Sequence, residues 1–384
     1  MRTVYLDNAA STRADESVME AIRPYFTDNY AVATSVFSYT MGLKSKRAID
    51  SARKIIAEKI SSSSDEIIFT SGETESNNIA ILGLARANKD RRHIITTETE
   101  NLSILKPIEK LKEEGFSVSY IPVDNEGFID CNALEKSIKK ETLMITICHA
   151  NEEIGTMQDI ERISKICKEK KIFFHLDATQ TFTKMSIDVK RLNITTLTLS
   201  SHTIHGPKGV GSLFIRKGTK IEKIMHGGFN EFDMRPGIEN VPAIVGFGKV
   251  VQISEKDCKK ISDLRDYLIE RITKEIPDIK INGPLGGKRL CNNVNISFRH
   301  VEGESILLRL DMKGICVSTG SACFSRSLEM SPTMKAIGNN HELSHGSIRF
   351  TLSKYTTKEE IDYTVESLKK IIKELRKISP LGKG

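Results

Sequence analysis

The sequence predicts an α/β protein, in which a large domain built on a mainly parallel, seven-stranded sheet is followed by a smaller α+β domain. The length of 384 residues exceeds one compact core and suits one large and one small domain. From about Asp65 to Lys217, short β-branched runs alternate with amphipathic helical stretches. After Val241 the alternation gives way to helices mixed with isolated strands, which is typical of an α+β domain.

Seven short apolar runs have the length and β-branched content of buried strands. They are EIIFT (66–70), HIITT (93–97), SVSYIPV (117–123), LMITICHA (143–150), KIFFHLDA (171–178), TLTLSS (196–201) and GSLFIRK (211–217). Apolar strands that are separated by helices indicate a largely parallel sheet covered on both faces. We therefore expect residues 14–250 to form the large domain.

The remaining residues, 1–13 with 251–384, are expected to form the small α+β domain. Its predicted helices cover roughly 245–275, 303–312 and 357–377, and its predicted strands are NVNISF (293–298) and SIRFTLS (347–353). The last helix has Thr357 as its predicted N-cap. Glu359 and Glu360 follow in the first turn, where acidic side chains are favourable.

Composition and charge predict a cytoplasmic protein without a membrane or nucleic-acid partner. Hydrophobic residues make up 39% and charged residues 28%, as in soluble globular proteins. The first residues, MRTVYLDNAAST, lack the pattern of a secretory signal, and no apolar run reaches the length of a membrane span. The net charge of +7 is spread over helix faces beside Glu, without a basic stripe or stacking aromatic residues.

Polar segments follow several of the predicted strands. They are SGETESNN (71–78), ETENLS (98–103), HANEEIG (149–155), DATQ (177–180) and SSHTIHGPKG (200–209). In an open parallel sheet, ligands bind just beyond the carboxyl ends of the strands. We therefore expect the functional site at this edge of the sheet.

These segments belong to a series of motifs that resembles the cysteine desulfurases of the class V aminotransferases. The series runs through YLDNAAST (5–12), TSGETESNN (70–78), HANEEIGT (149–156), FHLDATQ (174–180), SHTIHGPKGVG (201–211), RPGIENVP (235–242), STGSACFS (318–325) and HGSIRFTLS (345–353). The resemblance implies fold type I of the pyridoxal-phosphate (PLP) enzymes and a homodimer with active sites at the subunit interface. It also implies PLP-dependent activation of L-cysteine, whose sulfur passes to a loop cysteine as a persulfide for iron–sulfur cluster assembly.

The resemblance assigns roles to individual residues. Asp177 would lie under the pyridine nitrogen, where a carboxylate keeps the ring protonated. An alternative for Asp177 is that it merely caps the next helix. The other assigned residues are Gln180 at the ring hydroxyl, Thr74, Ser200 and His202 at the phosphate, Asn151 near the ring, and Arg349 at the substrate carboxylate.

Several departures from the family pattern fall on the cofactor pocket. Thr203 follows His202 where the family has the lysine that holds PLP covalently, and a hydroxyl cannot form an imine. Asn101 replaces the histidine that stacks on the ring, and Glu73 replaces an alanine beside the phosphate. Ile238 replaces the threonine that the partner subunit lends to the phosphate. The segments GGFNEF (227–232) and VATSVF (32–37) also differ from the family pattern.

Cys323 lies in the small-residue loop Gly320–Ser325. The loop composition and the resemblance favour an exposed, functional thiol over a buried one. Its role would be that of a sulfur acceptor or of an iron–sulfur cluster ligand. The other six of the seven cysteines form no C-x-x-C pair, and we interpret them as reduced, structural thiols.

Two functions are compatible with these observations. In the first, which the departures favour, the protein is a pseudoenzyme without ordinary PLP chemistry, and its homodimer presents Cys323 to an iron–sulfur scaffold protein. In the second, it is an active desulfurase that converts L-cysteine to L-alanine and an enzyme persulfide with non-covalently bound PLP. A selenocysteine lyase or an aminotransferase is disfavoured, because those enzymes also need the lysine.

Overall fold

The computed structural model of the protein describes residues 3–35, 37–254, 258–319 and 330–379, and the structural statements below concern these residues. A central sheet of seven strands has the order β2-β8-β7-β6-β5-β3-β4. The strands are β2 (Ile67–Thr70), β3 (His93–Thr97), β4 (Ser117–Ile121), β5 (Thr142–Cys148), β6 (Phe173–Asp177), β7 (Thr196–Ser200) and β8 (Gly211–Ile215). Only β8 is antiparallel to its neighbours β2 and β7. The predicted mainly parallel sheet is confirmed.

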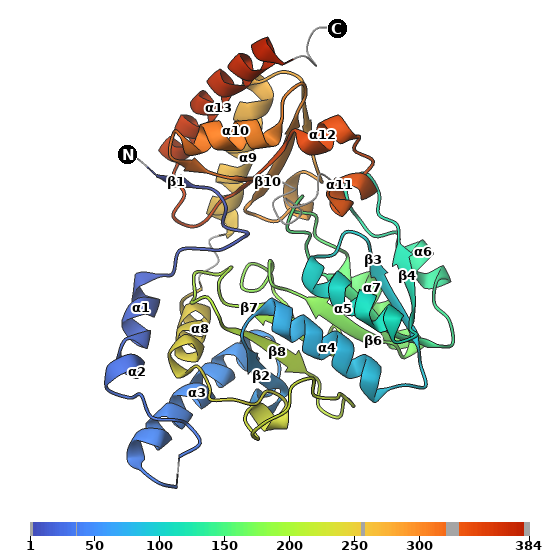
Figure 1. Cartoon of the computed structure of the whole chain (residues 1–384), viewed down its shortest axis with the longest axis vertical. Coiled ribbons are helices and arrows are strands. Elements are labelled where there is room, and N and C mark those ends of the chain that lie inside the picture. The colour runs from blue at the N-terminus through green and yellow to red at the C-terminus, as the bar shows by residue number, and fades with distance from the viewer. Residues whose placement is uncertain (1–2, 36, 255–257, 320–329, 380–384) are drawn as a thin grey trace.

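Helices cover both faces of this sheet (Figure 1). Successive strand residues point to opposite faces, and the core divides accordingly. Ile95 packs in one apolar cluster with α3 (Thr40–Lys59), α7 (Ile160–Lys170) and α8 (Val241–Ile253). Ile94 packs in another cluster with α4 (Glu73–Ala87) and α5 (Leu102–Glu113). The helical segments of this part are α1 (Glu16–Ile22), α2 (Pro24–Thr27), α3 (Thr40–Lys59), η1 (Ser64–Glu66), α4 (Glu73–Ala87), α5 (Leu102–Glu113), α6 (Cys131–Lys136), α7 (Ile160–Lys170), η2 (Glu231–Asp233) and α8 (Val241–Ile253).

A second apolar core is built on smaller sheets. Four strands have the order β12-β13-β10-β9, and β1 pairs with β11 in parallel. The strands are β1 (Val4–Tyr5), β9 (Ile279–Ile281), β10 (Asn293–Phe298), β11 (Ile315–Cys316), β12 (Ser318–Thr319) and β13 (Ser347–Thr351). The helical segments are α9 (Cys258–Glu275), η3 (Gly286–Lys288), α10 (Gly303–Asp311), α11 (Pro332–Ala336), α12 (His341–His345) and α13 (Lys358–Ile378). The smaller α+β unit is therefore present.

The helical region predicted for residues 245–275 is divided in the structure. α8 ends at Ile253, because Ser254 adopts an extended conformation with φ −65° and ψ 97°. Phe247 of α8 packs in the first core, whereas Leu268 of α9 packs in the second. We propose that the domain boundary lies beyond α8, a few residues after the predicted one.

The predicted start of the last helix is confirmed. The Thr357 hydroxyl accepts a hydrogen bond from the Glu360 amide at 3.2 Å, and the Glu360 carboxylate accepts one from the Thr357 amide at 3.0 Å. This reciprocal capping box satisfies two amides that the helix itself leaves unpaired. In the part of the chain that the structure describes, no helix has the length and apolar character of a membrane span.

The segment that follows β1 connects the second core to the central sheet. The Thr351 amide donates to the Leu6 carbonyl at 2.7 Å, and the Thr12 hydroxyl donates to the His202 carbonyl at 2.6 Å. In Figure 1 the dark blue segment accordingly runs from β1 toward the central sheet. This path places Asp7 and Ala9 at the edge of the functional site.

Candidate active site

A cavity of about 390 Å³ lies at the carboxyl ends of β5 and β6 and is lined on its other side by residues of β12, α11 and β13. Most of the predicted site residues line it: Thr74, Asn151, Asp177, Gln180, His202 and Arg349. Ser200 lies at its border, through a contact with Glu73 described below. Cys323 is outside the described residues.

Asp177 occupies the base of the cavity, because it is the last residue of β6 and is only 3% exposed. Its Oδ2 accepts hydrogen bonds from the side-chain amides of Asn77 at 2.7 Å and Asn101 at 3.2 Å. Its Oδ1 accepts from the Thr179 amide at 2.9 Å. The carboxylate therefore does more than cap the following turn, since amides from two other helices fix its orientation.

Asn101 stands where the resemblance expects a stacking histidine. It is the N-cap of α5, where its Oδ1 accepts from the Ile104 amide at 3.2 Å. Its Nδ2 reaches Asp177 and also lies 3.4 Å from the Cys148 sulfur. Asn101 thus couples the start of α5 to the base of the cavity through hydrogen bonds, without offering an aromatic face.

Arg349 of β13 brings a positive charge into the cavity. Its Nη2 donates to Asp7 at 2.9 Å, while its buried Nε has no partner within the described part of the chain. Burial acts to lower the pKa of the guanidinium, but the nearby carboxylates of Glu152 and Asp7 outweigh burial and raise the pKa. Arg349 is therefore charged and still able to donate to an acidic ligand.

Asn151 and Gln180 line the cavity but already have protein partners. The Asn151 side chain donates through Nδ2 to the Thr99 carbonyl at 2.8 Å, and its Oδ1 accepts from the backbone amides of Glu153 and Ile154. The Gln180 side chain donates through Nε2 to the Ala9 carbonyl at 3.1 Å. Asn151 therefore shapes the loop after β5, and Gln180 ties the site to the N-terminal segment.

The group predicted to hold a phosphate surrounds a carboxylate of the protein instead. The Ser200 hydroxyl donates to Glu73 Oε2 at 3.0 Å and lies 2.8 Å from His202 Nδ1. Because the only hydroxyl proton of Ser200 points to Glu73, His202 Nδ1 must donate to Ser200. Thr74, the next residue of α4, is exposed.

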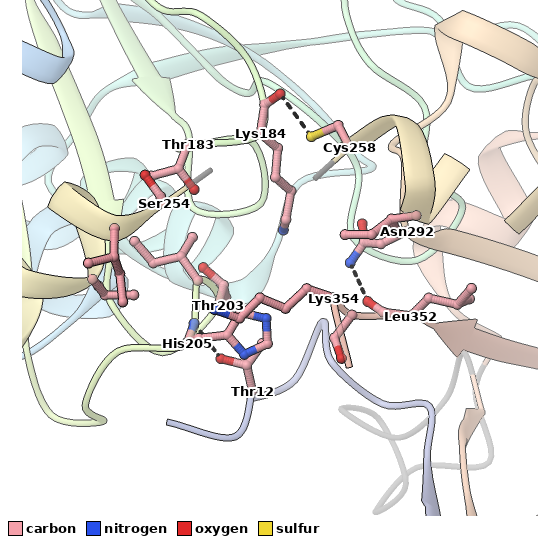
Figure 2. Close-up of a pocket in the computed structure, with 15 residues that line it drawn as sticks. Thr12, Thr183, Lys184, Thr203, His205, Ser254, Cys258, Asn292, Leu352 and Lys354 are labelled. Carbon is pink, nitrogen blue, oxygen red and sulfur yellow. Dashed lines mark hydrogen bonds between the residues drawn. The ribbon is translucent and has the colours of Figure 1, made fainter. Parts of the chain in front are cut away.

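Thr203 does not line the main cavity. Its hydroxyl donates to the Thr179 carbonyl at 2.7 Å, and the residue is only 2% exposed. Figure 2 shows it in a separate cavity of about 70 Å³, together with Lys184 and His205. The Lys184 ammonium donates to the Gln180 carbonyl at 2.9 Å. The Lys184 ammonium therefore lies behind the segment 179–180, which forms part of the wall of the main cavity.

Comparison with known proteins agrees with this geometry. The family model described as aminotransferase class-V matches residues 4–364. A cysteine desulfurase IscS from Dictyoglomus turgidum is 48% identical over 99% of this chain and 97% of its own length. A cysteine desulfurase IscS from Clostridium botulinum is 44% identical, with the same coverage of both chains. This chain belongs to the cysteine desulfurases of the class-V aminotransferase family.

A solved structure supports the same assignment to the desulfurase family. A NifS-like protein superposes with a TM-score of 0.91 at 33% identity, covering 97% of this chain and 100% of its own. The match extends over both apolar cores. The fold-type-I architecture expected from the resemblance is confirmed.

Three acidic residues in the cavity of this desulfurase-family chain were not singled out by the sequence analysis. Glu100, Glu152 and Glu153 follow the ends of β3 and β5 and line the cavity. Burial raises the pKa of all three carboxyls, to about 7 for Glu100 and for Glu153. Their positions in the polar segments that follow β3 and β5 were a usable signal, because such segments converge at one edge of the sheet.

The buried Glu100 predicts a pH-dependent stability. The pKa of Glu100 is higher in the folded protein than in the unfolded chain. Its contribution to the free energy of unfolding is therefore fully present below pH 4.5 and is lost as the pH rises to about 7. The effect amounts to roughly 3 kcal/mol across that window. We expect Glu100→Gln to reduce the change in the free energy of unfolding between pH 5 and 8, as measured by urea unfolding. The exposed control Glu98→Gln should leave the profile unchanged, and an equal slope in both variants would contradict the assignment.

The cavity fits a pyridoxal cofactor at one end and conflicts with it at the other. Asp177 is placed for a ring nitrogen, and Thr179 Oγ1 is a buried hydroxyl of the cavity wall without a partner among the described residues. Such a hydroxyl and the Nε of Arg349 leave hydrogen-bonding capacity for a polar ligand. The phosphate end, in contrast, holds the Glu73 carboxylate.

Proposed function

We propose that this chain acts on L-cysteine as a cysteine desulfurase of iron–sulfur cluster assembly, with a pyridoxal cofactor bound without a covalent link. The observation that carries the proposal is the convergence of Asp177, Gln180 and Arg349 on one cavity. The relatives from Dictyoglomus turgidum and Clostridium botulinum are cysteine desulfurases by name, which also favours this function over that of a pseudoenzyme.

The residues of the cavity have separate tasks in this function. When bound, the cofactor would withdraw electrons from the amino acid that it activates. Asp177 would hold the proton on the ring nitrogen, since its own orientation is fixed by Asn77 and Asn101. Arg349 would bind the substrate carboxylate through its unpartnered Nε and through Nη1, which makes only a 3.5 Å contact with the Glu152 carbonyl. Cys323 would take the sulfur as a persulfide and deliver it to a scaffold protein, leaving L-alanine.

A second candidate function rests on the phosphate end. Glu73 accepts a hydrogen bond from Ser200 where a phosphate would bind. At the position of the family's lysine, Thr203 donates to the Thr179 carbonyl and offers no amine for a covalent link. In that case the protein would be a pseudoenzyme, and Cys323 would serve a scaffold protein as a cluster ligand or as an acceptor of sulfur made elsewhere.

The release of sulfide and L-alanine from L-cysteine separates the two functions. We expect cofactor-dependent release by the native chain. We also expect an increase on Thr203→Lys, because a lysine loses the hydroxyl that holds Thr203 at the Thr179 carbonyl, and an amine that turns toward the main cavity both captures the aldehyde and carries protons. Cys323→Ser, which retains the cofactor cavity, should abolish transfer of sulfur to a scaffold protein. Absence of both products from the native chain with excess cofactor would refute the desulfurase proposal and favour the pseudoenzyme.

Exposed apolar side chains between β8 and α8 support a homodimer. Phe229 is 87% exposed and Ile238 72%, and Met225 and Phe232 are exposed in the same segment. Large apolar side chains that are exposed together in one segment are typical of an interface between subunits. We expect a molar mass of twice 43.0 kDa by light scattering, whereas a monomer at micromolar concentration would contradict this proposal.

We also propose that the protein works in the cytoplasm. Among the described cysteines, Cys131, Cys148, Cys167, Cys291 and Cys316 are thiols that form no disulfide. Free thiols are the usual state in a reducing compartment.

A further inference from the structure

Glu73 acts as a built-in anion at the start of α4. It is the first residue of a 15-residue helix, where the helix dipole and the free amides favour negative charge. The Ser200 hydroxyl donates to its Oε2 at 3.0 Å, and the His202 ring nitrogen lies 3.8 Å from the same oxygen. The Ser200 hydroxyl, which would otherwise donate to a phosphate, is thus directed at a carboxylate of the chain, and His202 donates to Ser200.

The surrounding charges do not compensate for this carboxylate. Arg235, which lies close to the same helix start, donates to Glu75 at 2.9 Å. The basic residues that line the main cavity or the adjoining shallow one are, in the described part of the chain, Arg349, His202 and Lys208. Arg349 is paired with Asp7, and Lys208 is exposed to solvent. Among the described residues, a phosphate dianion would therefore meet the negative charge of Glu73 without an unpaired, buried cation to offset it.

We infer that Glu73 makes this site selective for the non-phosphorylated form of a pyridoxal ligand, whose neutral 5′-hydroxymethyl group donates to the Glu73 carboxylate. The inference rests on the proposed function, in which the cavity holds a pyridoxal cofactor. A hydroxymethyl group carries a donor for Glu73 and adds no charge. A phosphate carries only acceptors and negative charge at neutral pH, so it must displace the carboxylate from Ser200.

The test compares pyridoxamine with pyridoxamine 5′-phosphate, which differ only in the phosphate and lack the aldehyde that reacts with amines. We expect the native full-length chain to bind pyridoxamine at least about tenfold more tightly in isothermal titration calorimetry at pH 7.5. Glu73→Ala should reverse this preference, because it frees Ser200 and His202 for the phosphate. Glu73→Gln keeps the size of the side chain and the acceptor for Ser200 but removes the charge, so it should weaken the preference for pyridoxamine. This variant keeps the test decisive if Glu73→Ala fails to fold.

The charge-matched control is Glu58→Gln on the exposed surface of α3, which should bind both probes like the native chain. Tighter binding of the phosphorylated probe to the native chain would overturn the inference, as would an unchanged ratio of affinities in both Glu73 variants. In either case the proposed function would stand. Absence of binding of both probes to the native chain, to Glu73→Ala and to Glu73→Ala combined with Thr203→Lys would instead refute the pyridoxal site itself, and the proposed function with it.

Discussion

Glu231→Ala is expected to destabilise the protein by about 3–5 kcal/mol, because it leaves a buried guanidinium without its counter-charge. Glu231 accepts two hydrogen bonds from Arg53, each 2.7 Å long, and a third from the Phe69 amide at 2.7 Å. The side chains of the pair are 7% and 3% exposed. Urea unfolding followed by circular dichroism measures the change in the free energy of unfolding.

The backbone around Glu231 adds to this expectation. Glu231, Phe232 and Asp233 have φ values of 49°, 56° and 65°, a left-handed run that side chains other than glycine rarely adopt. The ion pair with Arg53 holds this run against β2, so its loss releases the segment. A matched control is Glu161→Ala, which breaks an ion pair with Arg191 whose side chains are 58% and 59% exposed. It should cost less than about 1 kcal/mol. Equal effects of the two substitutions would show that the buried pair has no special role.

Arg349→Ala is expected to lower kcat/KM for L-cysteine by about 10²- to 10⁴-fold. Two charge-assisted hydrogen bonds to a substrate carboxylate contribute about 1.5–3 kcal/mol each, and every 1.4 kcal/mol corresponds to a factor of ten. The measurement is the initial rate of L-alanine formation over a range of L-cysteine concentrations.

Two variants make the Arg349 result interpretable. Arg349→Lys keeps the charge but loses the planar pair of donors, so we expect an intermediate loss. Arg309→Ala breaks an ion pair with Glu374 on the surface of α10 and should leave kcat/KM unchanged. A native-like kcat/KM in Arg349→Ala, with its thermal stability intact, would remove Arg349 from substrate binding.

The sequence was sufficient to predict the sheet and the edge on which the site lies. Asp177 could be placed because a polar residue at the end of a buried strand lies at the carboxyl end of the sheet. Arg349 and Gln180 could be assigned only from the resemblance to the desulfurases. Their convergence on one cavity depends on how the two cores pack, which no local pattern encodes.

The hydrogen-bond partners of the changed residues could not be predicted. Glu73 was recognised as a departure from the family pattern beside the phosphate, but its hydrogen bond from Ser200 joins residues 127 positions apart. Thr203 was recognised as standing in place of the family's lysine. Its hydrogen bond to the Thr179 carbonyl, which the sequence could not reveal, directs its side chain away from the main cavity and toward the smaller one. The tertiary structure decides such contacts, since a short polar side chain has several possible partners within its reach.

The ion pair between Asp7 and Arg349 has a consequence for the biogenesis of the protein. Its partners are 342 positions apart, and the β1–β11 pairing that supports it joins segments that are almost as distant. At about 5–20 residues per second, the ribosome adds Arg349 roughly 20–70 s after Asp7. During that interval the central sheet can form on the growing chain, but the substrate pocket still lacks one of its walls. A nascent chain that stalls before β13 would therefore be folded in large part and yet unable to capture an amino acid.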